Sequence, residues 1–439
     1  MQSSSRDRAA LRSLTLRATS PDRFISDNRI HVSIDSLRYR ASIDAQRLRG
    51  RSVLLMTEAQ LPTVLAMLDL DGVVARMILC TPDQQQHAES LIQRATIDTV
   101  IDTSKIDCQL GHPVYDDRSI ETEWVLLTSG TTGLPKMAIH TLSSLAGPLN
   151  DGLIATGAVW STFYDVRRYG GLQMLLRALL GGGSMILSDQ EETPTEFLRR
   201  LSKKGVTHIS GTPSHWRRAL MSEAATAMSP AYVRLSGEIV DQAILDHLRR
   251  TYPKANLGHA FASTEAGVAF DVRDGKEGFP ASYLGCRDLK AELRIENGTL
   301  HIRSSRTARG YIGAPLNGYD GFVDTGDLVE QRGNRCYFAG RREGVINVGG
   351  QKVFPEEVEA VIAKHPAIQM ARVWARKNAV TGSLVAADVM LRPDAPALAD
   401  LRRDLMNHCR QHLPDWKVPA SIREVDHIAL SAAGKVARA

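Results

Sequence analysis

Short apolar segments alternate with amphipathic segments in two long parts of the chain, and this alternation constrains the fold most. In the first part, strands are expected at 52–56, 76–79 and 99–101, with helices over about 60–74 and 87–95. In the second part, strands are expected near 207–209, 233–235 and 256–261, with helices over about 213–223 and 241–251. Strands that alternate with helices form parallel sheets covered by helices. The sequence therefore predicts a large α/β domain.

The pattern changes near residue 290. Residues 292–296 and 299–303 alternate between apolar and polar side chains around Asn297-Gly298, a strong signal for a two-residue hairpin. A second hairpin is expected at Gly333-Asn334, and a smaller unit from about residue 344 contains a helix that begins at Pro355. The sequence thus predicts an α/β protein with a small antiparallel β subdomain and a small α+β C-terminal domain.

Length and charge limit the possible classes of protein. A chain of 439 residues with 43% hydrophobic residues needs more than one core. The net charge is only +5, and residues 1–51 hold eleven arginines, five aspartates and neither lysine nor glutamate. Such an N-terminus could bind nucleic acid or act as a transit peptide, but without interleaved aromatic residues a solvated segment is preferred. With neither a signal-peptide pattern nor an apolar run of membrane-spanning length, we expect a cytoplasmic protein without a nucleic-acid or membrane partner.

The cysteines and histidines give no metal-binding pattern. The five cysteines are odd in number and form no Cys-x-x-Cys pair, which argues against a disulfide framework and a zinc site. His408 and His412 lie four residues apart on a predicted helix and could chelate a metal. With no glutamate between them and no third ligand, a surface pair is preferred.

A loop of small, hydroxyl-bearing and flexible residues follows the apolar run 124–127. It consists of Thr128, Ser129, Gly130, Thr131, Thr132, Gly133, Leu134, Pro135 and Lys136. Glycines let backbone N–H groups turn inward and hydroxyl groups add donors, so the loop predicts a cradle for phosphates. It is not a Walker loop, because Lys136 comes three residues after Gly133 and follows a proline that would disturb a helix start.

The loop resembles the signature of the adenylate-forming superfamily, which includes acyl- and aryl-CoA synthetases, peptide-synthetase adenylation domains and luciferases. Four later segments match that family in the same order: residues 261–265, 325–327, 341–350 and 431–438. The resemblance extends from about residue 120 to the C-terminus. It implies a large adenylation domain over 1–341 and a small mobile C-terminal domain over 342–439. It also implies ATP, Mg²⁺, a carboxylic acid and a thiol acceptor, either CoA or a phosphopantetheinyl carrier protein.

The resemblance implies roles for residues around the nucleotide. The ring of Phe261 would lie against adenine, Thr264 would contact phosphate, and Glu265 would bind Mg²⁺; Phe261 and Ala262 replace the usual Tyr and Gly. Asp327 would accept hydrogen bonds from both ribose hydroxyls, and Arg341 would reach the ribose or a phosphate. The remaining members of the implied ATP site are the loop residues 128–133 with Lys136, and His259, Ala260, Ala262 and Ser263.

The C-terminal segments carry a hinge and a lysine by the same resemblance. Glu343 stands at the hinge position, where the family usually has Asp or Lys, and Asn347 replaces a frequent Lys. Gly434-Lys435 matches the motif that presents the catalytic lysine, although Ala429-Leu430 replaces the usual Pro-Arg. The Lys435 ammonium would lie between the substrate carboxylate and the α-phosphate, where negative charges meet in the transition state.

The acyl group is the least constrained part of the substrate. Phe163-Tyr164-Asp165 lies where the family has an aromatic gate, and Ser236, Gly237, Glu238 and Gly258 should border the pocket. These mostly compact residues favour an aromatic or medium-sized acid. Asp165 either pairs with a substrate amine or is a local structural residue, and the adjacent Arg167 and Arg168 favour the second interpretation.

These inferences predict an ATP-dependent acid–thiol ligase that forms an acyl-AMP and then a thioester. Two enzymatic alternatives are an amino-acid-activating enzyme and an enzyme that transfers the acyl group to an amine. A noncatalytic ligand-binding protein with the same fold is an alternative of another class, because the stretch before the phosphate loop is several tens of residues shorter than in most of the family. Lys136, Glu265, Asp327, Arg341 and Lys435 all stand at motif positions and favour an enzyme, which we expect to be a monomer or a homodimer.

Overall fold

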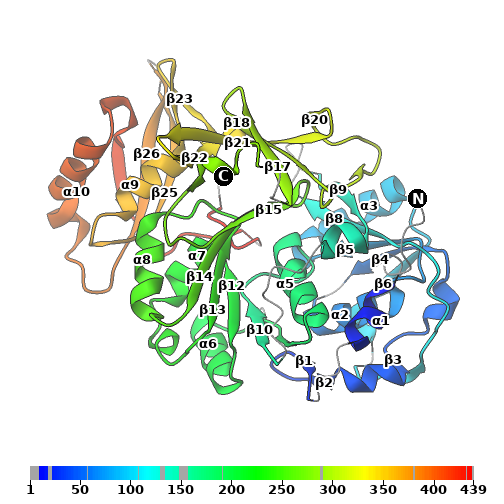
Figure 1. Ribbon diagram of the computed structural model, residues 1–439. Coiled ribbons are helices and arrows are strands. Elements are labelled where there is room, and N and C mark those ends of the chain that lie inside the picture. Colours follow the sequence, from blue (N-terminus) through cyan, green and yellow to red (C-terminus); the bar gives the residue numbers. More distant parts are fainter. Residues whose placement is uncertain are drawn as a thin grey trace.

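The computed structural model describes residues 9–17, 22–56, 58–106, 108–128, 134–147, 157–189, 191–286, 290–378, 381–431 and 433–437. Two helix-covered sheets form the larger part of the molecule, followed along the chain by an antiparallel sheet and a smaller α/β unit. Figure 1 shows the N-terminus and helix α10 (Leu398–His412) at opposite ends of the molecule. None of the helices in the described ranges has both the length and the apolar character needed to cross a membrane.

The first large sheet confirms the alternation predicted for residues 52–101. Its strand order is β19-β9-β8-β5-β4-β6, with bounds Gly310–Tyr311, Lys136–His140, Glu123–Thr128, Arg76–Cys80, Ser52–Met56 and Thr99–Asp102. Helices α2 (Gln60–Leu70) and α3 (Ala88–Ala95) connect its parallel strands. Helix α2 ends four residues earlier than predicted, because Gly72 takes a φ of +84° in the left-handed region.

The second large sheet has eight strands in the order β15-β14-β13-β12-β10-β11-β1-β2. Their bounds are Gly267–Val272, Asn256–Ser263, Tyr232–Ser236, His208–Gly211, Val159–Thr162, Ser184–Ile186, Phe24–Ser26 and His31–Ser33. Helices α6 (Pro194–Lys203), α7 (Pro213–Ala219) and α8 (Gln242–Thr251) contribute to one core beside this sheet. Helix α7 is shorter than the predicted 213–223, because a 3-10 turn over Glu223–Ala225 follows it.

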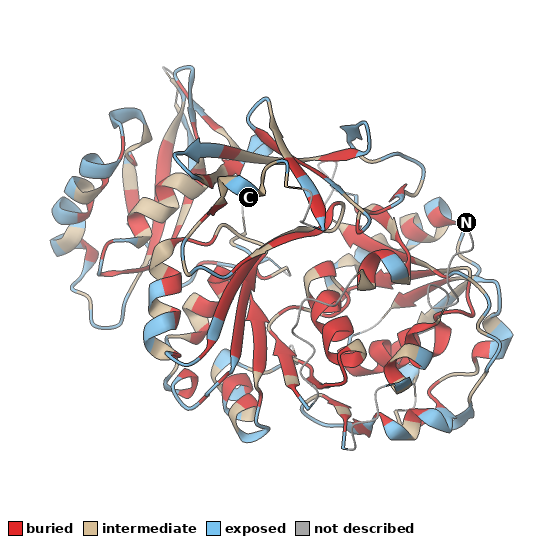
Figure 2. Ribbon diagram, in the orientation of Figure 1, coloured by how far each residue is buried: buried red, intermediate tan, exposed pale blue. Residues whose placement is uncertain are grey.

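Two buried helices join the large sheets. Every residue of α2 is buried, and α5 (Tyr169–Leu180) is almost entirely buried. Their apolar side chains share one core with Val53 and Leu55 of the first sheet and with Trp160 and Met185 of the second. Figure 2 shows the strands and helices of this interior mostly in red, whereas exposed residues lie on outer helix faces, in loops and on strands of the antiparallel sheet. The two sheets therefore form one continuous body.

Two of the N-terminal arginines correct the expectation of a solvated segment, whereas seven others between Arg17 and Arg51 are exposed, as expected. Residues Leu11–Arg17 form helix α1, and Arg12 is 2% exposed, where it pairs with Asp69 and donates to the carbonyls of Leu37 and Arg40. Arg23, 4% exposed, donates to three backbone carbonyls, those of Thr15, Leu179 and Gly183. A guanidinium group has five donors, so surrounding carbonyl groups can satisfy it inside a core. These two arginines are structural and form no basic surface.

The antiparallel subdomain contains both predicted hairpins. Strands β17 (Ala291–Glu296) and β18 (Thr299–Ser304) pair around Asn297-Gly298, whose φ angles are +50° and +80°. Strands β21 (Phe322–Arg332) and β22 (Arg335–Arg341) pair around Gly333-Asn334. Strands β16 (Phe279–Pro280) and β20 (Gly318–Tyr319) complete this sheet. Because β21 and β22 are long, their ends reach the space between the large sheets and the small unit (Figure 1).

The small C-terminal unit has its own core, formed by apolar residues between Ile346 and Ile422. Its elements are a hairpin, helices α9 and α10, and a three-stranded sheet. Their bounds are β23 Ile346–Val348, β24 Gln351–Val353, α9 Pro355–Ala363, β25 Ile368–Asn378, β26 Gly382–Leu391, α10 Leu398–His412 and β27 Ser421–Glu424. After β27 the tail leaves this unit and returns to the large sheets near α7, as the red trace in Figure 1 shows.

Candidate active site

The predicted phosphate loop connects two antiparallel strands. Thr128 ends β8, Lys136 begins β9, and their Cα atoms are paired in the sheet. After Pro135 the chain therefore continues as an antiparallel strand and not as a helix, as expected from this proline. Residues Ser129, Gly130, Thr131, Thr132 and Gly133 lie outside the described residues. The Lys136 Nζ atom lies 5.5 Å from the centre of the Tyr311 ring, which places its charge at the base of the loop.

Glu265 lies beside this loop. Its Oε1 atom accepts hydrogen bonds from the Tyr311 hydroxyl at 3.0 Å and from the Thr128 hydroxyl at 3.4 Å. Burial and the neighbouring Glu265 carboxylate raise the pKa of Tyr311, so Tyr311 stays a proton donor. One residue earlier, the carbonyl oxygen of Thr264 lies 2.7 Å from Nε2 of the buried His140. These contacts fix the turn 264–265 against strand β9.

Asp327 and Arg341 face each other across strands β21 and β22. They are partners in the sheet register, and Arg341 Nε donates to Asp327 Oδ1 at 3.1 Å. The Asp327 carboxylate raises the pKa of Arg341. The other carboxylate oxygen, Oδ2, is buried without a hydrogen-bond partner among the described residues. A buried carboxylate oxygen without a donor is costly, so this atom is suited to accept from a ligand hydroxyl.

Lys435 sits at the tip of a tight turn in the C-terminal tail. Ser431 N donates to Lys435 O at 2.7 Å, Gly434 N donates to Ser431 O at 2.8 Å, and Leu430 bridges Val436 across the turn. The Lys435 side chain keeps solvent access, yet surrounding protein lowers its pKa by desolvation, with Arg341 as the next cause. The carboxylates of Glu238, Asp327 and Glu265 act in the opposite direction.

These five side chains, Glu238, Glu265, Asp327, Arg341 and Lys435, form what we call the charged cluster. Four of them act electrostatically on the fifth, Lys435. Glu238 and Glu265 come from the second large sheet, Asp327 and Arg341 from the antiparallel subdomain, and Lys435 from the tail. Glu238 follows strand β13 and Glu265 follows β14, whereas Asp327 lies in the middle of β21 and Arg341 at the end of β22. The structure thus brings together four of the charged motif residues, Glu265, Asp327, Arg341 and Lys435, and adds Glu238 from the predicted border of the acyl pocket.

The residues of strand β14 divide between its two faces. His259 Nε2 lies 2.9 Å from the carbonyl oxygen of Lys276, and burial lowers the pKa of this histidine. Phe261 stacks on Phe338 at 5.1 Å, within the core of the antiparallel subdomain. Alternate residues of a strand point to the same face, so His259 and Phe261 share one face and Gly258 and Ala260 the other; a β-bulge between Phe261 and Ala262 interrupts this alternation. Ser263 caps the next turn by accepting from Ala266 N at 3.0 Å.

Aromatic side chains gather near the tail at the predicted acyl gate. The Tyr164 hydroxyl donates to Ser236 O at 2.7 Å, and burial raises its pKa. Phe163 stacks on His215 at 5.5 Å between ring centres, and Tyr164 meets the same imidazole edge-on at 5.7 Å. Desolvation, with the Arg218 charge second, lowers the pKa of His215 to about 4, so the ring is neutral near pH 7. Gly237 adds no side chain here and lies close to Lys435, because a Cβ on it would be 3.6 Å from Lys435 Cε.

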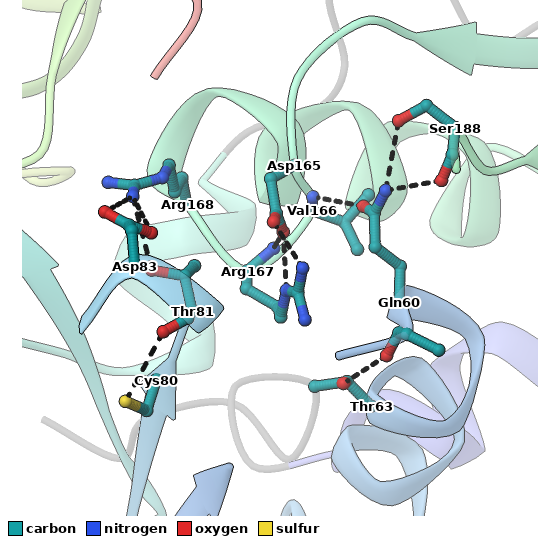
Figure 3. A network of polar contacts seen from close by, with 11 residues as sticks. Gln60, Thr63, Cys80, Thr81, Asp83, Asp165, Val166, Arg167, Arg168 and Ser188 are labelled. Atoms are coloured by element: carbon teal, nitrogen blue, oxygen red, sulfur yellow. Dashed lines mark hydrogen bonds and ion pairs between the residues drawn. The ribbon is translucent and has the colours of Figure 1, made fainter. Parts of the chain in front are cut away.

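Asp165 is engaged by its neighbour. Figure 3 shows its carboxylate folded onto Arg167, which donates from its backbone N at 2.9 Å, from Nε at 2.8 Å and from Nη2 at 2.5 Å. Arg168 turns the other way and pairs with Asp83 at 2.6 Å. The Arg167 side chain has no exposed area. This arrangement favours the local structural role for Asp165 over an amine contact.

Several residues of this region were not singled out from the sequence. Tyr311, His140, Thr212 and His215 contact the predicted site residues, but none belongs to a recognised motif. A signal exists for Thr212 and His215, which open the helix that follows strand β12: the carboxyl ends of parallel strands commonly gather at a ligand site. Tyr311 reaches Glu265 through the pairing of β19 with β9.

No self-contained metal site exists in the described part of the chain, where three or more His, Cys, Asp or Glu side chains nowhere gather to hold an ion. His408 and His412 also form no such group with other described side chains: His408 Nε2 lies 3.0 Å from the carbonyl oxygen of Val361, and His412 Nδ1 lies 2.8 Å from that of His408. Mg²⁺, however, is commonly held by one or two carboxylates together with substrate phosphates. Glu265, beside the loop at 128–136, fits that mode of binding.

Two family models match the chain. A family described as "AMP-binding enzyme" matches residues 50–312, and one described as "AMP-binding enzyme C-terminal domain" matches residues 357–435. The 2-succinylbenzoate–CoA ligase of Geobacillus kaustophilus is 29% identical over 349 residues, which cover 72% of this chain and 68% of the ligase. A dimodular nonribosomal peptide synthase of Bacillus subtilis is 25% identical over 374 residues, 75% of this chain. The chain spans only 16% of that synthase.

Solved structures share the fold along nearly the whole chain. The o-succinylbenzoate CoA synthetase of Bacillus subtilis, in complex with its acyl-adenylate intermediate, matches with a TM-score of 0.73 at 18% identity over 96% of each chain. An amide bond synthetase from Marinactinospora thermotolerans matches with a TM-score of 0.72 at 18% identity over 97% of each chain. The predicted fold class is confirmed by these neighbours.

Proposed function

The chain belongs to the adenylate-forming AMP-binding enzymes, and from that premise we propose that it is an acid–thiol ligase for an aromatic or medium-sized carboxylic acid. In the first half-reaction, a carboxylate oxygen attacks the α-phosphorus of ATP, so that acyl-AMP forms and pyrophosphate leaves. In the second, a thiolate attacks the acyl carbon and AMP leaves. The adenylate makes an unreactive carboxylate susceptible to the thiol.

One observation supports this proposal above the others: the charged cluster collects around Lys435. Lys435 is under the electrostatic influence of Arg341, Asp327 and Glu265, which the sequence motifs had assigned to a single nucleotide site, and of Glu238, which was expected to border the acyl pocket. Joining two anions requires positive charge where they meet, and Lys435 and Arg341 supply it. A ligand-binding protein without catalysis has no need of such a lysine at the end of a folded tail.

The ribose and the phosphates would be held by different parts of the site. The unpartnered Oδ2 of Asp327 suits a ribose hydroxyl, and Arg341 stands beside it. Lys136 and the loop at 128–133 would bind the leaving phosphates. Phe261 is already stacked on Phe338, so adenine would use what remains accessible of this half-buried ring.

Glu265 would hold Mg²⁺ through its carboxylate, with Thr128 and Tyr311 fixing the carboxylate by hydrogen bonds. Mg²⁺ supplies charge neutralisation for the triphosphate when it is bound. Thr264 would contact phosphate from the adjoining position, in a turn anchored by His140.

The acyl group would lie against Tyr164 and the neighbouring Phe163–His215 stack, with Ser236 and Gly237 at its border. Aromatic walls and a neutral imidazole favour an aromatic ring over a long aliphatic chain or a charged amine. The name of the 2-succinylbenzoate–CoA ligase also points to an aromatic acid for that relative.

The small unit would move as a body about Glu343. Strand β22 ends at Arg341, and a separate core begins at Ile346, which supports a boundary between 341 and 342. Glu343 lies in the short turn Arg342–Gly344 between them. Rotation there would carry Lys435 out of the site and open a path for the thiol acceptor.

The test is acid-dependent release of pyrophosphate from ATP. We expect release with one or more acids in a panel of benzoates, fatty acids and amino acids, and the largest rate with a benzoate. CoA and a pantetheinylated carrier protein, added separately, identify the thiol acceptor, and a panel of amines tests transfer to an amine. If none of the acids causes release of pyrophosphate from ATP, the proposal is contradicted.

Asp327→Asn should weaken nucleotide binding. Asparagine keeps the shape but loses the charge that pairs with Arg341 and one of the two acceptor oxygens. A hydrogen bond to a charged group contributes ~1.5–3 kcal/mol, so we expect the KM for ATP to rise about 10- to 100-fold. Steady-state pyrophosphate release measures it, with Asp246→Asn on the outer face of α8 as a matched control. An unchanged KM for ATP would exclude the ribose role.

The adenylation rate should fall at alkaline pH because of Lys435. Desolvation and Arg341 lower its pKa, so the ammonium is lost below the ordinary lysine value of about 10.4. The charged form is the active one. The kcat/KM for ATP reports ionisations of the free enzyme, so it should decrease as pH rises through the lowered pKa. The residual activity of Lys435→Ala should lack this alkaline decrease, and an identical pH profile in both proteins would contradict the assignment.

A further inference from the structure

The tail that carries Lys435 is held by hydrogen bonds on both sides of this residue. Before it, the Thr212 hydroxyl donates to the Gly434 carbonyl oxygen at 2.6 Å. After it, the Val436 N–H group donates to Glu238 Oε1 at 2.9 Å. Thr212 and Glu238 follow the neighbouring strands β12 and β13, so both anchors belong to the large sheet and both clamped groups to the tail.

The anchors are themselves rigid. Thr212 has no exposed area and caps α7 by accepting from His215 N at 3.0 Å. Glu238 accepts from Ser214 N at 2.9 Å through Oε2 and from the Ser214 hydroxyl at 3.0 Å through Oε1. One carboxylate therefore joins the start of α7 to the tail, and its position is set before the tail arrives.

The tail also fits the His215 ring closely. A Cβ added to Gly434 would lie 1.8 Å from His215 Cε1, and the φ of Gly434 is +71°, in the left-handed region. The backbone N–H group of Thr212 lies 3.2 Å from His215 Nδ1, so Nδ1 accepts and the neutral ring carries its proton on Nε2. Only a residue without a side chain can approach the imidazole this closely.

We propose that Thr212, His215 and Glu238 form a latch that docks the tail in the adenylation state, and that they are positioning residues for Lys435. The latch deepens the proposed function, on which its catalytic consequences rest. Its two hydrogen bonds flank Lys435, so they fix the backbone from which the long side chain extends and leave the ammonium free to reach the reacting groups. All latch contacts cross between tail and sheet, so they must break when the tail withdraws for the second half-reaction.

Docking is tested first on the protein without substrates, by hydrogen–deuterium exchange of a peptide that covers residues 430–437. Glu238→Ala removes the acceptor of the Val436 N–H group, Thr212→Val removes the hydroxyl, and Gly434→Ala places a methyl group against His215. We expect about 10- to 100-fold faster exchange in Glu238→Ala, the factor for loss of one charge-assisted hydrogen bond, and a similar steric effect in Gly434→Ala. Thr212→Val loses a neutral hydrogen bond, so we expect about 2- to 10-fold faster exchange in that variant. Thr212→Ser keeps the hydroxyl and should restore slow exchange.

Ser214→Ala is the matched control for the helix side of the latch. It removes a contact of Glu238 within the large sheet and leaves the Val436 contact in place. Exchange in the tail should stay slow in this variant. If Ser214→Ala accelerates tail exchange as much as Glu238→Ala does, Glu238 acts only through α7, and the latch is overturned.

The two half-reactions give the second readout. Glu238→Ala and Gly434→Ala should lower acyl-AMP formation about 10- to 100-fold, and Thr212→Val about 2- to 10-fold, by reducing kcat more than they raise the KM for ATP. Thioester formation from supplied acyl-AMP should be unchanged or faster, since the docked state is weakened. Equal loss in both half-reactions would overturn the latch. Absence of any adenylation in the wild-type protein would defeat the proposed function, while tail exchange would still decide whether the latch exists.

Discussion

Replacement of Lys435 by alanine should lower the rate of acyl-AMP formation about 10² to 10³-fold, or ~2.7–4 kcal/mol of transition-state stabilisation. The loss is expected because, in the proposed function, Lys435 would bring an ammonium group to the point where the carboxylate and the α-phosphate approach each other. The same variant should form thioester from supplied acyl-AMP at close to the wild-type rate. Quenched-flow measurement of each half-reaction separates the two effects.

The control for this substitution is Lys203→Ala, at the exposed end of α6. It removes one lysine charge from the surface and should leave both half-reactions unchanged. The latch predicts in addition that Lys435→Ala keeps slow hydrogen exchange in the tail, because the clamped groups belong to the backbone of Gly434 and Val436. Loss of both half-reactions to the same extent in Lys435→Ala would contradict the role of this residue.

The second large effect is expected for Glu265→Gln. Glutamine keeps an oxygen that accepts from Tyr311 and Thr128, so the turn should retain its structure. It removes the negative charge of the carboxylate that we assign to Mg²⁺. We expect adenylation to fall about 10² to 10³-fold at a fixed Mg²⁺ concentration, a range typical for loss of one preorganised electrostatic contact.

Calorimetric titration of ATP at several Mg²⁺ concentrations gives a readout without turnover. Wild-type affinity for ATP should rise with Mg²⁺, and Glu265→Gln should lose most of this dependence. Glu89→Gln, on an exposed position of α3, is the matched carboxylate control. A wild-type Mg²⁺ dependence in Glu265→Gln would assign the ion to other ligands.

Much of the fold could be predicted because local signals agreed with the final structure. Asn297-Gly298 and Gly333-Asn334 fix two hairpins through backbone angles that few other residues adopt, and the alternation over 52–101 left little choice but a parallel sheet. The course of the N-terminus could not be predicted in this way. From composition alone, Arg12 and Arg23 are expected to be surface charges. In the structure they are buried, and Asp69 and several backbone carbonyl groups accept their hydrogen bonds.

In the candidate site, too, residues in local motifs could be predicted and residues that depend on contacts between distant segments could not. Glu265, Asp327, Arg341 and Lys435 lie in short motifs, so their chemistry is readable from sequence, and the structure brings them together. Tyr311 and His215 act through contacts between segments far apart in the chain. Such contacts depend on strand pairing and on the return of the tail, neither of which leaves a local pattern. His259 shows the opposite case, because its side chain turns to Lys276 on the far face of β14 from Gly258 and Ala260.

The most direct measurement is a crystal structure of the protein with ATP and Mg²⁺ bound. The charged cluster predicts the ribose hydroxyls within hydrogen-bond distance of Asp327, the metal on Glu265, and the Lys435 ammonium directed at the α-phosphate from a tail held by Thr212 and Glu238. A triphosphate bound away from the loop at 128–136, or a ribose that makes no contact with Asp327, would contradict the central claim that these segments serve one nucleotide.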